Sequence, residues 1–441
     1  MLLKNIGLTL RGEIYIFLLD LYFLSSYQEH FSNLMKRRIF KMGLFIANGV
    51  SALTPPEVIT NEVLSRHNVY GVTFDGKSSK GKPLYNAIDQ KWIPATATDP
   101  GVDTWKNVAP FNVKKCITDY DASATYKRKV LAYEGDGNYD TLKADKTGDR
   151  MIEFPMGYYY RPDPWTFIVS PDPIEGFQPS PACDLGNGTI LKGFRLSEFD
   201  LCNVSSVPRS IPGYGPWVNV NAQTLKNSLK AKGQYLETFG AWCWINFLAA
   251  IKHQNLNSQK VNGMGINSGD STRVMTEDNI QGLDGYIGIA ANDNVRTLGL
   301  QNFYGHVWDF LHNVMVRSAS KVWIKKDFIN ADTWPTYSDA IPSGWEELSV
   351  SLPGAASNTW VSEVAWNSAE PWALYPSKFG GNDIEPIGDA CWNAANDPFS
   401  VVLVGGDAWR GSADGALYWS SNNPLFLVHV NFGGRGLEIT S

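Results

Sequence analysis

The clearest alternation of side-chain types lies near the C-terminus, where residues 425–432 read LFLVHVNF. β-branched and aromatic residues dominate this run, which predicts a strand. Since successive side chains of a strand point to opposite faces, each face can be read separately. One face is uniformly apolar and is expected to point into the core: Phe426, Val428, Val430 and Phe432. The other face is chemically mixed: Leu425, Leu427, His429 and Asn431.

The mixed face of this predicted strand fits neither a solvent face, which is normally polar, nor a core face, which is apolar throughout. Exposed aliphatic side chains beside polar ones are typical of a contact surface. We therefore expect Leu427, His429 and Asn431 to point to solvent. A strand covered by another part of the same chain is the alternative.

Elsewhere the pattern predicts many short strands, long loops and few helices. The run VYGVTF at 69–74 precedes a turn-rich DGKSSKGK, and KVLAYEGDGNYD at 129–140 contains the DG and GD pairs that mark hairpins. Helical periodicity is clearest at 225–232 and at 238–252, and the second stretch is apolar nearly all round, which predicts a buried helix. The fold class predicted from this pattern is α+β.

A length of 441 residues predicts either one large domain with extra segments or two to three domains. The apolar run at 14–24 is shorter than the roughly 20 residues that span a bilayer, and no clean cleavage site follows it. Because ordinary globular composition begins at Met42, we interpret residues 1–41 as an upstream extension of the reading frame. A membrane-associated helix and an ordinary packed helix are the alternatives. The predicted division places a β-rich N-terminal module at 42–149 and one compact domain at 150–441.

Composition narrows the possible partners. The chain is 44% hydrophobic and 19% charged, so it can bury a large core. Its net charge of -6 and its lack of a basic run interleaved with aromatic residues argue against nucleic acid. Membrane insertion is not expected either. The five cysteines are odd in number and form no CxxC, which favours buried free thiols over a zinc site or a disulfide framework.

Motifs for catalysis or metal binding are weak. The run EGDGNYD at 134–140 spaces oxygen ligands as a calcium loop does, but Tyr139 occupies the position that needs glycine, so a hairpin tip is the better interpretation. His306 and His312 are too far apart for a zinc helix motif, although Asp309 and His312 could form a hydrogen bond. No GxSxG, P-loop or dinucleotide fingerprint occurs. We expect no enzyme activity, no cofactor and no metal.

Four segments together resemble a family of viral tail proteins. They lie at 151–183, 238–267, 298–314 and 388–439. In this family the C-terminal domain has the C-type lectin fold, in the variant shared with formylglycine-generating enzymes. Asn302, Gly305, Val307 and Trp308 match the signature N-x-x-G-N-V-W-E, with His306 and Asp309 at positions where Asn and Glu are usual. Gly433-Gly434-Arg435 matches the closing G-x-R. The resemblance extends upstream to about residue 67.

In several members of this family, the C-terminal stretch is the variable region of a diversity-generating retroelement. The resemblance places that region at about 405–435, where glycines tolerant of positive φ would hold the loops. It implies the following ligand-binding positions: Asp407, Ala408, Arg410, Ala413, Asp414, Tyr418, Trp419, Ser420, Ser421, Leu427, His429 and Asn431. We expect Tyr418, Trp419 and Arg410 to be the energetic anchors, with Trp419 alternatively part of the scaffold.

The resemblance implies a receptor-binding protein at the tail tip of a virion, made in the host cytoplasm. Its partners would be a host surface protein or glycan and other tail proteins, and a homotrimer is compatible with this role. A fixed adhesin, or a structural tail or baseplate protein, is the alternative. Catalysis is not implied because no cysteine follows Cys391, and the Glu-Pro-Asn motif of calcium-dependent lectins does not occur.

Overall fold

The computed structural model describes residues 59–440, except for 268, 278, 289–292, 318–319, 330–342 and 394–398. These described residues belong to one compact unit that begins at Pro55. The predicted extension at 1–41 lies outside the described residues. No helix in the described part of the chain is long and apolar enough to cross a membrane.

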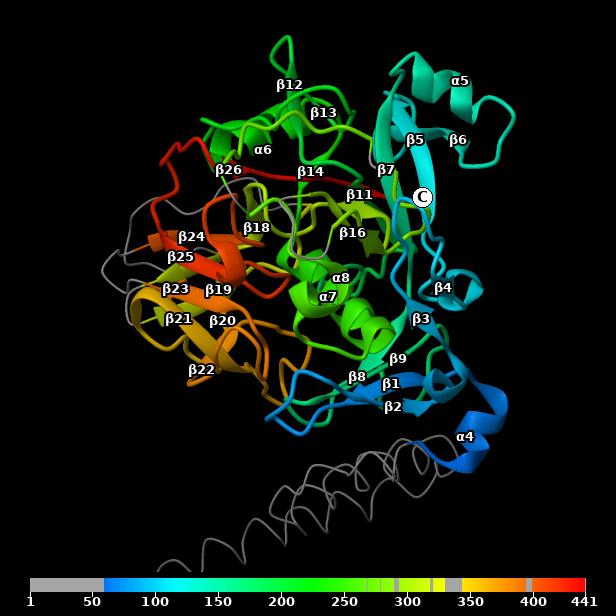
Figure 1. The fold of residues 1–441 in the computed structure, drawn as a ribbon, viewed down its shortest axis with the longest axis vertical. Helices are drawn as coiled ribbons and strands as arrows, with labels where there is room; N and C mark the ends of the chain where they lie inside the picture. The colour runs from blue at the N-terminus through cyan, green and yellow to red at the C-terminus, as the bar shows by residue number, and fades with distance from the viewer. Residues whose placement is uncertain are drawn as a thin grey trace, which may run out of the picture. The chain divides into compact units, whose positions relative to one another are not determined.

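Helices are few among the described residues, as the pattern predicts. The α-helices are α4 (Asn61–Arg66), α5 (Tyr139–Ala144), α6 (Ala222–Lys230), α7 (Phe239–His253) and α8 (Ser258–Asn262). Short 3-10 helices are η1 (Asn86–Asp89), η2 (Trp105–Asn107) and η4 (Gly411–Ala413). The molecule is therefore β-rich with few helices (Figure 1).

The first sheet has the strand order β10-β8-β9-β1-β2 and is antiparallel. Its strands are β1 (Tyr70–Thr73), β2 (Lys82–Tyr85), β8 (Tyr158–Tyr160), β9 (Thr166–Ser170) and β10 (Gln178–Pro179). The pairing of β1 with β2 confirms the hairpin predicted around DGKSSKGK. The sheet thus joins the start of the chain to residues near 160–180.

The second sheet has the strand order β14-β27-β11-β7-β5-β6 and is also antiparallel. Its strands are β5 (Lys114–Tyr120), β6 (Arg128–Tyr133), β7 (Asp149–Pro155), β11 (Gly193–Ser197), β14 (Tyr235–Leu236) and β27 (Gly436–Ile439). The boundary predicted between 149 and 150 falls inside β7, which pairs with β5 on one side and β11 on the other. Backbone hydrogen bonds of this sheet therefore run across that boundary.

The third sheet has the order β20-β19-β18-β24-β25-β23-β21-β22, with β26 paired to β18. Its strands are β18 (Trp308–Arg317), β19 (Lys321–Ile324), β20 (Glu346–Glu347), β21 (Ala355–Val364), β22 (Pro376–Phe379), β23 (Ala390–Asn393), β24 (Phe399–Val404), β25 (Trp419–Asn423) and β26 (Phe432–Gly433). The pairs β23/β25 and β18/β26 are parallel. This sheet holds the C-terminal loops.

The remaining strands of the described residues form three small sheets. They are formed by β3 (Trp92–Ile93) with β4 (Val102–Asp103), by β12 (Cys202–Val204) with β13 (Val207–Arg209), and by β15 (Gly285–Tyr286), β16 (Val295–Thr297) and β17 (Leu300–Gln301). All five cysteines are buried and free, as the sequence predicts.

Helix α7 lies at the centre of the main core and contacts β1, β9 and β18 (Figure 1). The Thr238 hydroxyl caps it by accepting a hydrogen bond from the Ala241 N–H at 3.1 Å. All fifteen of its residues are buried, which confirms the predicted buried helix. At its C-terminal end the buried Asp284 carboxylate accepts from Lys252 Nζ at 2.7 Å, and these contacts hold the pKa of Asp284 well below its usual range against the opposing effect of burial.

Two local predictions are wrong. The predicted strand at 425–432 is a loop, because only Phe432 pairs with a neighbouring strand. The run EGDGNYD is not a hairpin tip: its Asp136 closes a turn on Tyr133, and the chain then enters α5. The hairpin partner of β6 is β5, through the preceding turn. The alternating pattern at 425–432 and the turn residues at 134–140 are therefore both present without the strand pairing that was predicted from them.

Candidate functional site

A buried arginine fixes the end of the chain to the core. Arg435 is fully enclosed, and its Nε donates to Asp309 Oδ2 at 3.0 Å while Nη2 donates to Asp200 Oδ1. The same guanidinium also donates to four backbone carbonyls, those of Ser197, Glu198, Gln301 and Asn302. The closing Gly-Gly-Arg motif and the signature at 302–309 are therefore bonded to each other.

Carboxyl groups outnumber the cations around this arginine. Burial raises the pKa of Asp309 to about 7, an effect that Arg435 opposes and Asp200 reinforces. Burial also raises the pKa of Glu237 well above its usual value, and the charge of Asp309 adds to this effect. Asp200 additionally contacts His306 Nδ1 at 2.7 Å. Asp309 is thus paired with Arg435 through its Oδ2 atom.

This arrangement predicts that stability falls as the pH rises. The pKa of Asp309 is about 7 in the folded chain and about 4 in an unfolded chain. Because the pKa is higher in the folded chain, protonation of Asp309 stabilises the fold. This contribution is complete at pH values below the pKa of the unfolded chain and is lost as the pH rises through the pKa of the folded chain. Between pH 5 and pH 8, urea denaturation should show the free energy of unfolding falling by about 1–3 kcal/mol.

The Asp309→Asn variant provides the control, because the amide stays neutral at every pH. We expect the pH slope of its free energy of unfolding to be clearly flatter than that of the parent. An unchanged slope would assign the pH dependence to other groups.

Another buried carboxylate, that of Asp407, joins the two C-terminal loops. Its Oδ2 accepts from the indole Nε1 of Trp308 at 2.7 Å and from the side-chain amide of Asn431. Its Oδ1 accepts from the backbone N–H of Trp409 at 2.8 Å. Asp407 of loop 405–410 therefore bonds both Asn431 of loop 424–431 and the Trp308 side chain.

The residues predicted to form the binding face are mostly enclosed. Those with at most 7% of their surface exposed are Asp407, Ala408, Ala413, Asp414, Tyr418, Trp419, Ser420, Ser421 and Asn431. The expectation that Asn431 faces solvent is wrong, because its side-chain amide bonds the buried Asp407. Tyr418, expected to be an energetic anchor, packs on Trp308. Trp419 packs against Phe239 and Trp242 of α7, so its position is that of a scaffold residue. Arg410 is half-buried, and Leu427 and His429 are exposed as expected.

Of the four side chains expected in the core, Phe432 is buried, but the other three lie at the surface. Phe426 is 59% exposed, Val428 48% and Val430 40%. Trp409, which the sequence reasoning missed, is 48% exposed. Two signals were available: Pro424 cannot donate to a strand ladder, and Leu425 and Leu427 made both faces of the supposed strand partly apolar.

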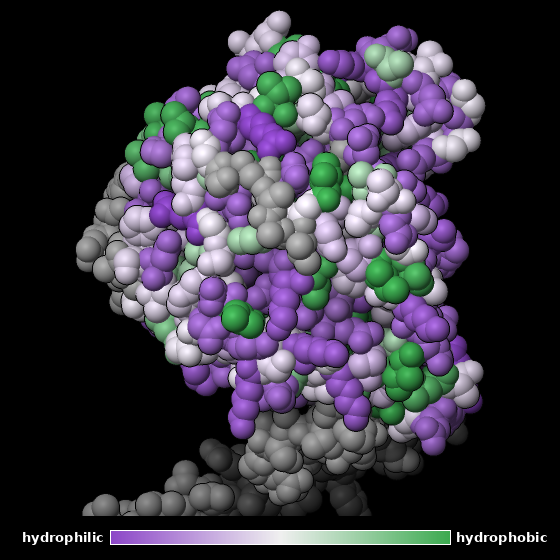
Figure 2. Space-filling view, viewed as in Figure 1, coloured by the Kyte–Doolittle hydropathy of each residue, from purple (hydrophilic) through white to green (hydrophobic). Residues whose placement is uncertain are grey.

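We call Trp409, Phe426, Leu427, Val428 and Val430 the apolar loop surface. The second loop is held to the core at its C-terminal end, since Asn219 N–H donates to His429 O at 2.9 Å and Trp308 N–H donates to Asn431 O at 2.8 Å. Figure 2 shows hydrophobic surface at the upper left, where Figure 1 draws the red segment that leads into β26. Neighbouring exposed apolar side chains on a fixed backbone are typical of an interaction site.

The described residues thus define a β-rich protein with a fixed C-terminal loop surface. No family model matches the chain, and no curated protein matches it. Among solved structures it is similar to the Major Tropism Determinant I1 Variant, with 11% identity and a TM-score of 0.26 over 56% of this chain and 50% of that chain. The chain thus covers about half of that protein's length.

Two related structures are matched over longer stretches. The U1 Variant of the Major Tropism Determinant has 11% identity and a TM-score of 0.28, with 74% of this chain and 72% of that chain covered. The M1 Variant has the same identity and TM-score, with 74% and 71% covered.

Proposed function

We propose that this chain is a receptor-binding protein of a viral tail, which attaches to a host surface protein through the apolar loop surface. The observation that carries the proposal is the exposure of Trp409 and Phe426 on loops anchored to buried Asp407. Burying such aromatic side chains in a partner would supply binding energy, and the fixed backbone lowers the entropy that binding loses.

The partner proposed for this surface is a protein and not a glycan. Phe426, Leu427, Val428 and Val430 carry no side-chain hydrogen-bonding group, whereas a sugar needs such groups for its hydroxyls. Apolar and aromatic side chains of this kind are typical of the centre of a protein–protein interface. The proposed role is therefore binding without catalysis, and its proposed place is the tail tip of a virion.

The proposal also includes the lectin-fold variant and the retroelement diversification that the resemblance implies. We place residues 150–441 in the C-type lectin fold of the formylglycine-generating-enzyme variant, supported by the bond between Asp309 and Arg435 of its two signature segments. Retroelement diversification would then be confined to positions whose side chains leave the core untouched. Those positions are Trp409, Arg410, Phe426, Leu427, Val428, His429 and Val430.

Attachment should be lost without loss of stability when the apolar loop surface is changed. Since the proposed tail is that of a phage, whose host is a bacterium, labelled protein is first tested on a panel of bacterial strains to find one that it binds. The double variant Trp409→Ala, Phe426→Ser should then bind these cells at least tenfold more weakly, because hot-spot residues typically contribute about 2 kcal/mol each. Its melting temperature should stay within about 2 °C of the parent, as both side chains are largely exposed.

Ile88→Ser is the matched control, since Ile88 is 64% exposed but lies on η1, remote in sequence from the loops. It should bind cells as the parent does. Loss of self-association or of tail-protein binding in the double variant, with cell binding unchanged, would favour the structural tail or baseplate role instead.

A further inference from the structure

A cationic cavity lies away from the apolar loop surface. It has a volume of about 960 Å³ and is lined by β5, the end of β6, the chain around η2, residues 280–283 and Arg296 of β16. Its cationic lining residues are Lys106, Lys114, Lys115 and Arg296, and its acidic ones are Asp103 and Glu134. A concave site of this size is large enough for a ligand of several sugar rings or a comparable small molecule.

The acidic side chains neutralise only part of this charge. Asp103 is already engaged by Lys252 Nζ at 2.8 Å and by the Trp105 N–H at 3.0 Å. Glu134 is 59% exposed and lies 4.0 Å from Lys115 Nζ. Lys106 has no carboxylate partner among the described residues, and Lys114 lies over the Tyr133 ring at 5.6 Å. Among the residues that line the cavity, four cations thus stand against two carboxylates, in a chain whose net charge is -6.

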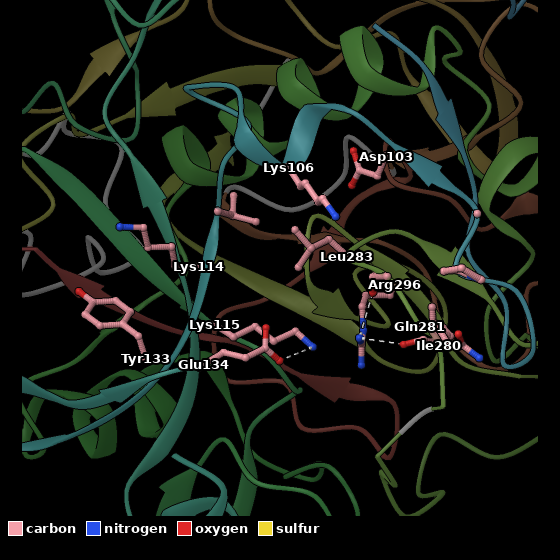
Figure 3. A pocket seen from close by; sticks show the side chains of 14 residues that line it. Asp103, Lys106, Lys114, Lys115, Tyr133, Glu134, Ile280, Gln281, Leu283 and Arg296 are labelled. Atoms are coloured by element: carbon pink, nitrogen blue, oxygen red, sulfur yellow. Dashed lines mark hydrogen bonds and ion pairs between the residues drawn. The ribbon is translucent and has the colours of Figure 1, made fainter. Parts of the chain in front are cut away.

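Two of the cations are held in place by the protein core. The Lys115 side chain is 10% exposed, and its Nζ lies 3.7 Å from the buried Glu198 carboxylate. Arg296 donates to the Gly282 carbonyl at 3.1 Å and the Ile280 carbonyl at 3.4 Å. In Figure 3 the nitrogens of Lys115 and Arg296 are turned toward each other, whereas Lys114 points to the side where Tyr133 lies.

Burial lowers the pKa of Lys115, with Glu198 opposing and Arg296 reinforcing this effect. Its ammonium group is therefore poorly solvated and repelled by a neighbouring cation. An anion in the cavity would offset both the lost hydration of Lys115 and its repulsion by Arg296. It would do so because a charge-assisted hydrogen bond is stronger where water is excluded.

We propose that this cavity is a second binding site, which takes an acidic saccharide through its carboxylate groups. Lys115 and Lys106, which both line the cavity, would donate to the carboxylate oxygens. The preference for an anion rests on the cavity alone, whereas the choice of a saccharide rests on the proposed attachment function. The site would bind surface polysaccharide independently of the protein partner of the loops.

Calorimetric titration of the full chain tests the proposal with four probes: oligogalacturonate, the uncharged maltohexaose, a sulfated heparin hexasaccharide and inorganic phosphate. We expect oligogalacturonate to bind at low salt and to weaken as salt screens the charges, and maltohexaose not to bind. Lys106→Gln and Lys115→Gln should each weaken binding about tenfold. Lys82→Gln, at an exposed position of β2, is the matched control and should leave it unchanged.

Lys106 is exposed, so its variant stays informative if loss of Lys115 disturbs the buried Glu198. Equal affinity for phosphate or the sulfated saccharide would overturn the assignment to a carboxylated saccharide. Absence of binding by every anion, or binding insensitive to Lys106→Gln, would overturn the site itself. The Trp409→Ala, Phe426→Ser variant should still bind oligogalacturonate, so failure of the loop proposal is distinguishable from failure of this one.

Discussion

Replacing Arg435 with Leu is expected to leave the chain largely unfolded at room temperature. The guanidinium interacts with three buried carboxyl groups, Asp200, Asp309 and Glu237, and donates to four backbone carbonyls. Removing it leaves these groups enclosed without their cation. Breaking a buried ion pair in this way costs about 3–5 kcal/mol, and the orphaned carbonyls add to that figure. A typical protein has only about 5–15 kcal/mol of stability in total.

Chemical denaturation followed by circular dichroism measures this effect. Arg66→Leu is the matched control, because the same substitution there removes an exposed pair with Glu62 at 2.8 Å, which is worth about 0–1 kcal/mol. Arg435→Lys should be intermediate, since it keeps the charge but loses the planar fork of donors. A denaturation midpoint of Arg435→Leu close to that of Arg66→Leu would show that the buried network is dispensable.

The Trp308→Ala variant is expected to be destabilised by about 3–5 kcal/mol, as for other buried large aromatic residues. Trp308 is 2% exposed, and its ring centroid lies 4.5 Å from that of Tyr418. The substitution also removes the indole donor from the buried Asp407 carboxylate. Since Asp407 holds both C-terminal loops, the loss should extend to the geometry of the apolar loop surface.

Two variants separate these contributions. Trp308→Phe keeps much of the ring volume and should cost about 1–3 kcal/mol, from the hydrogen bond that Asp407 loses. Trp409→Ala removes an indole that is 48% exposed, while its backbone N–H still donates to Asp407. Urea denaturation should place Trp409→Ala within about 0.5 kcal/mol of the parent. Equal destabilisation of the Trp308 and Trp409 variants would contradict the positions assigned to the two side chains.

The sequence was most informative where a local pattern and burial agree. The apolar stretch at 238–252 could only be a buried helix, because no face of it suits water, and α7 is that helix. The turn-rich segment after 69–74 predicted the β1–β2 hairpin. The signature residue Trp308 lies in the core, and so does the closing Arg435.

Only the tertiary structure decided which side chains near the C-terminus meet water. Residues 425–432 alternate as a strand does, but a strand also needs a neighbour to receive its backbone hydrogen bonds, and alternation carries no information about a neighbour. Without one, residues 426–430 form an exposed loop. Conversely, Asp407 and Asn431 look like surface residues in sequence but are buried, because Trp308 and the Trp409 backbone satisfy their hydrogen bonds. Burial of a polar side chain depends on partners brought from a hundred residues away, which no local pattern specifies.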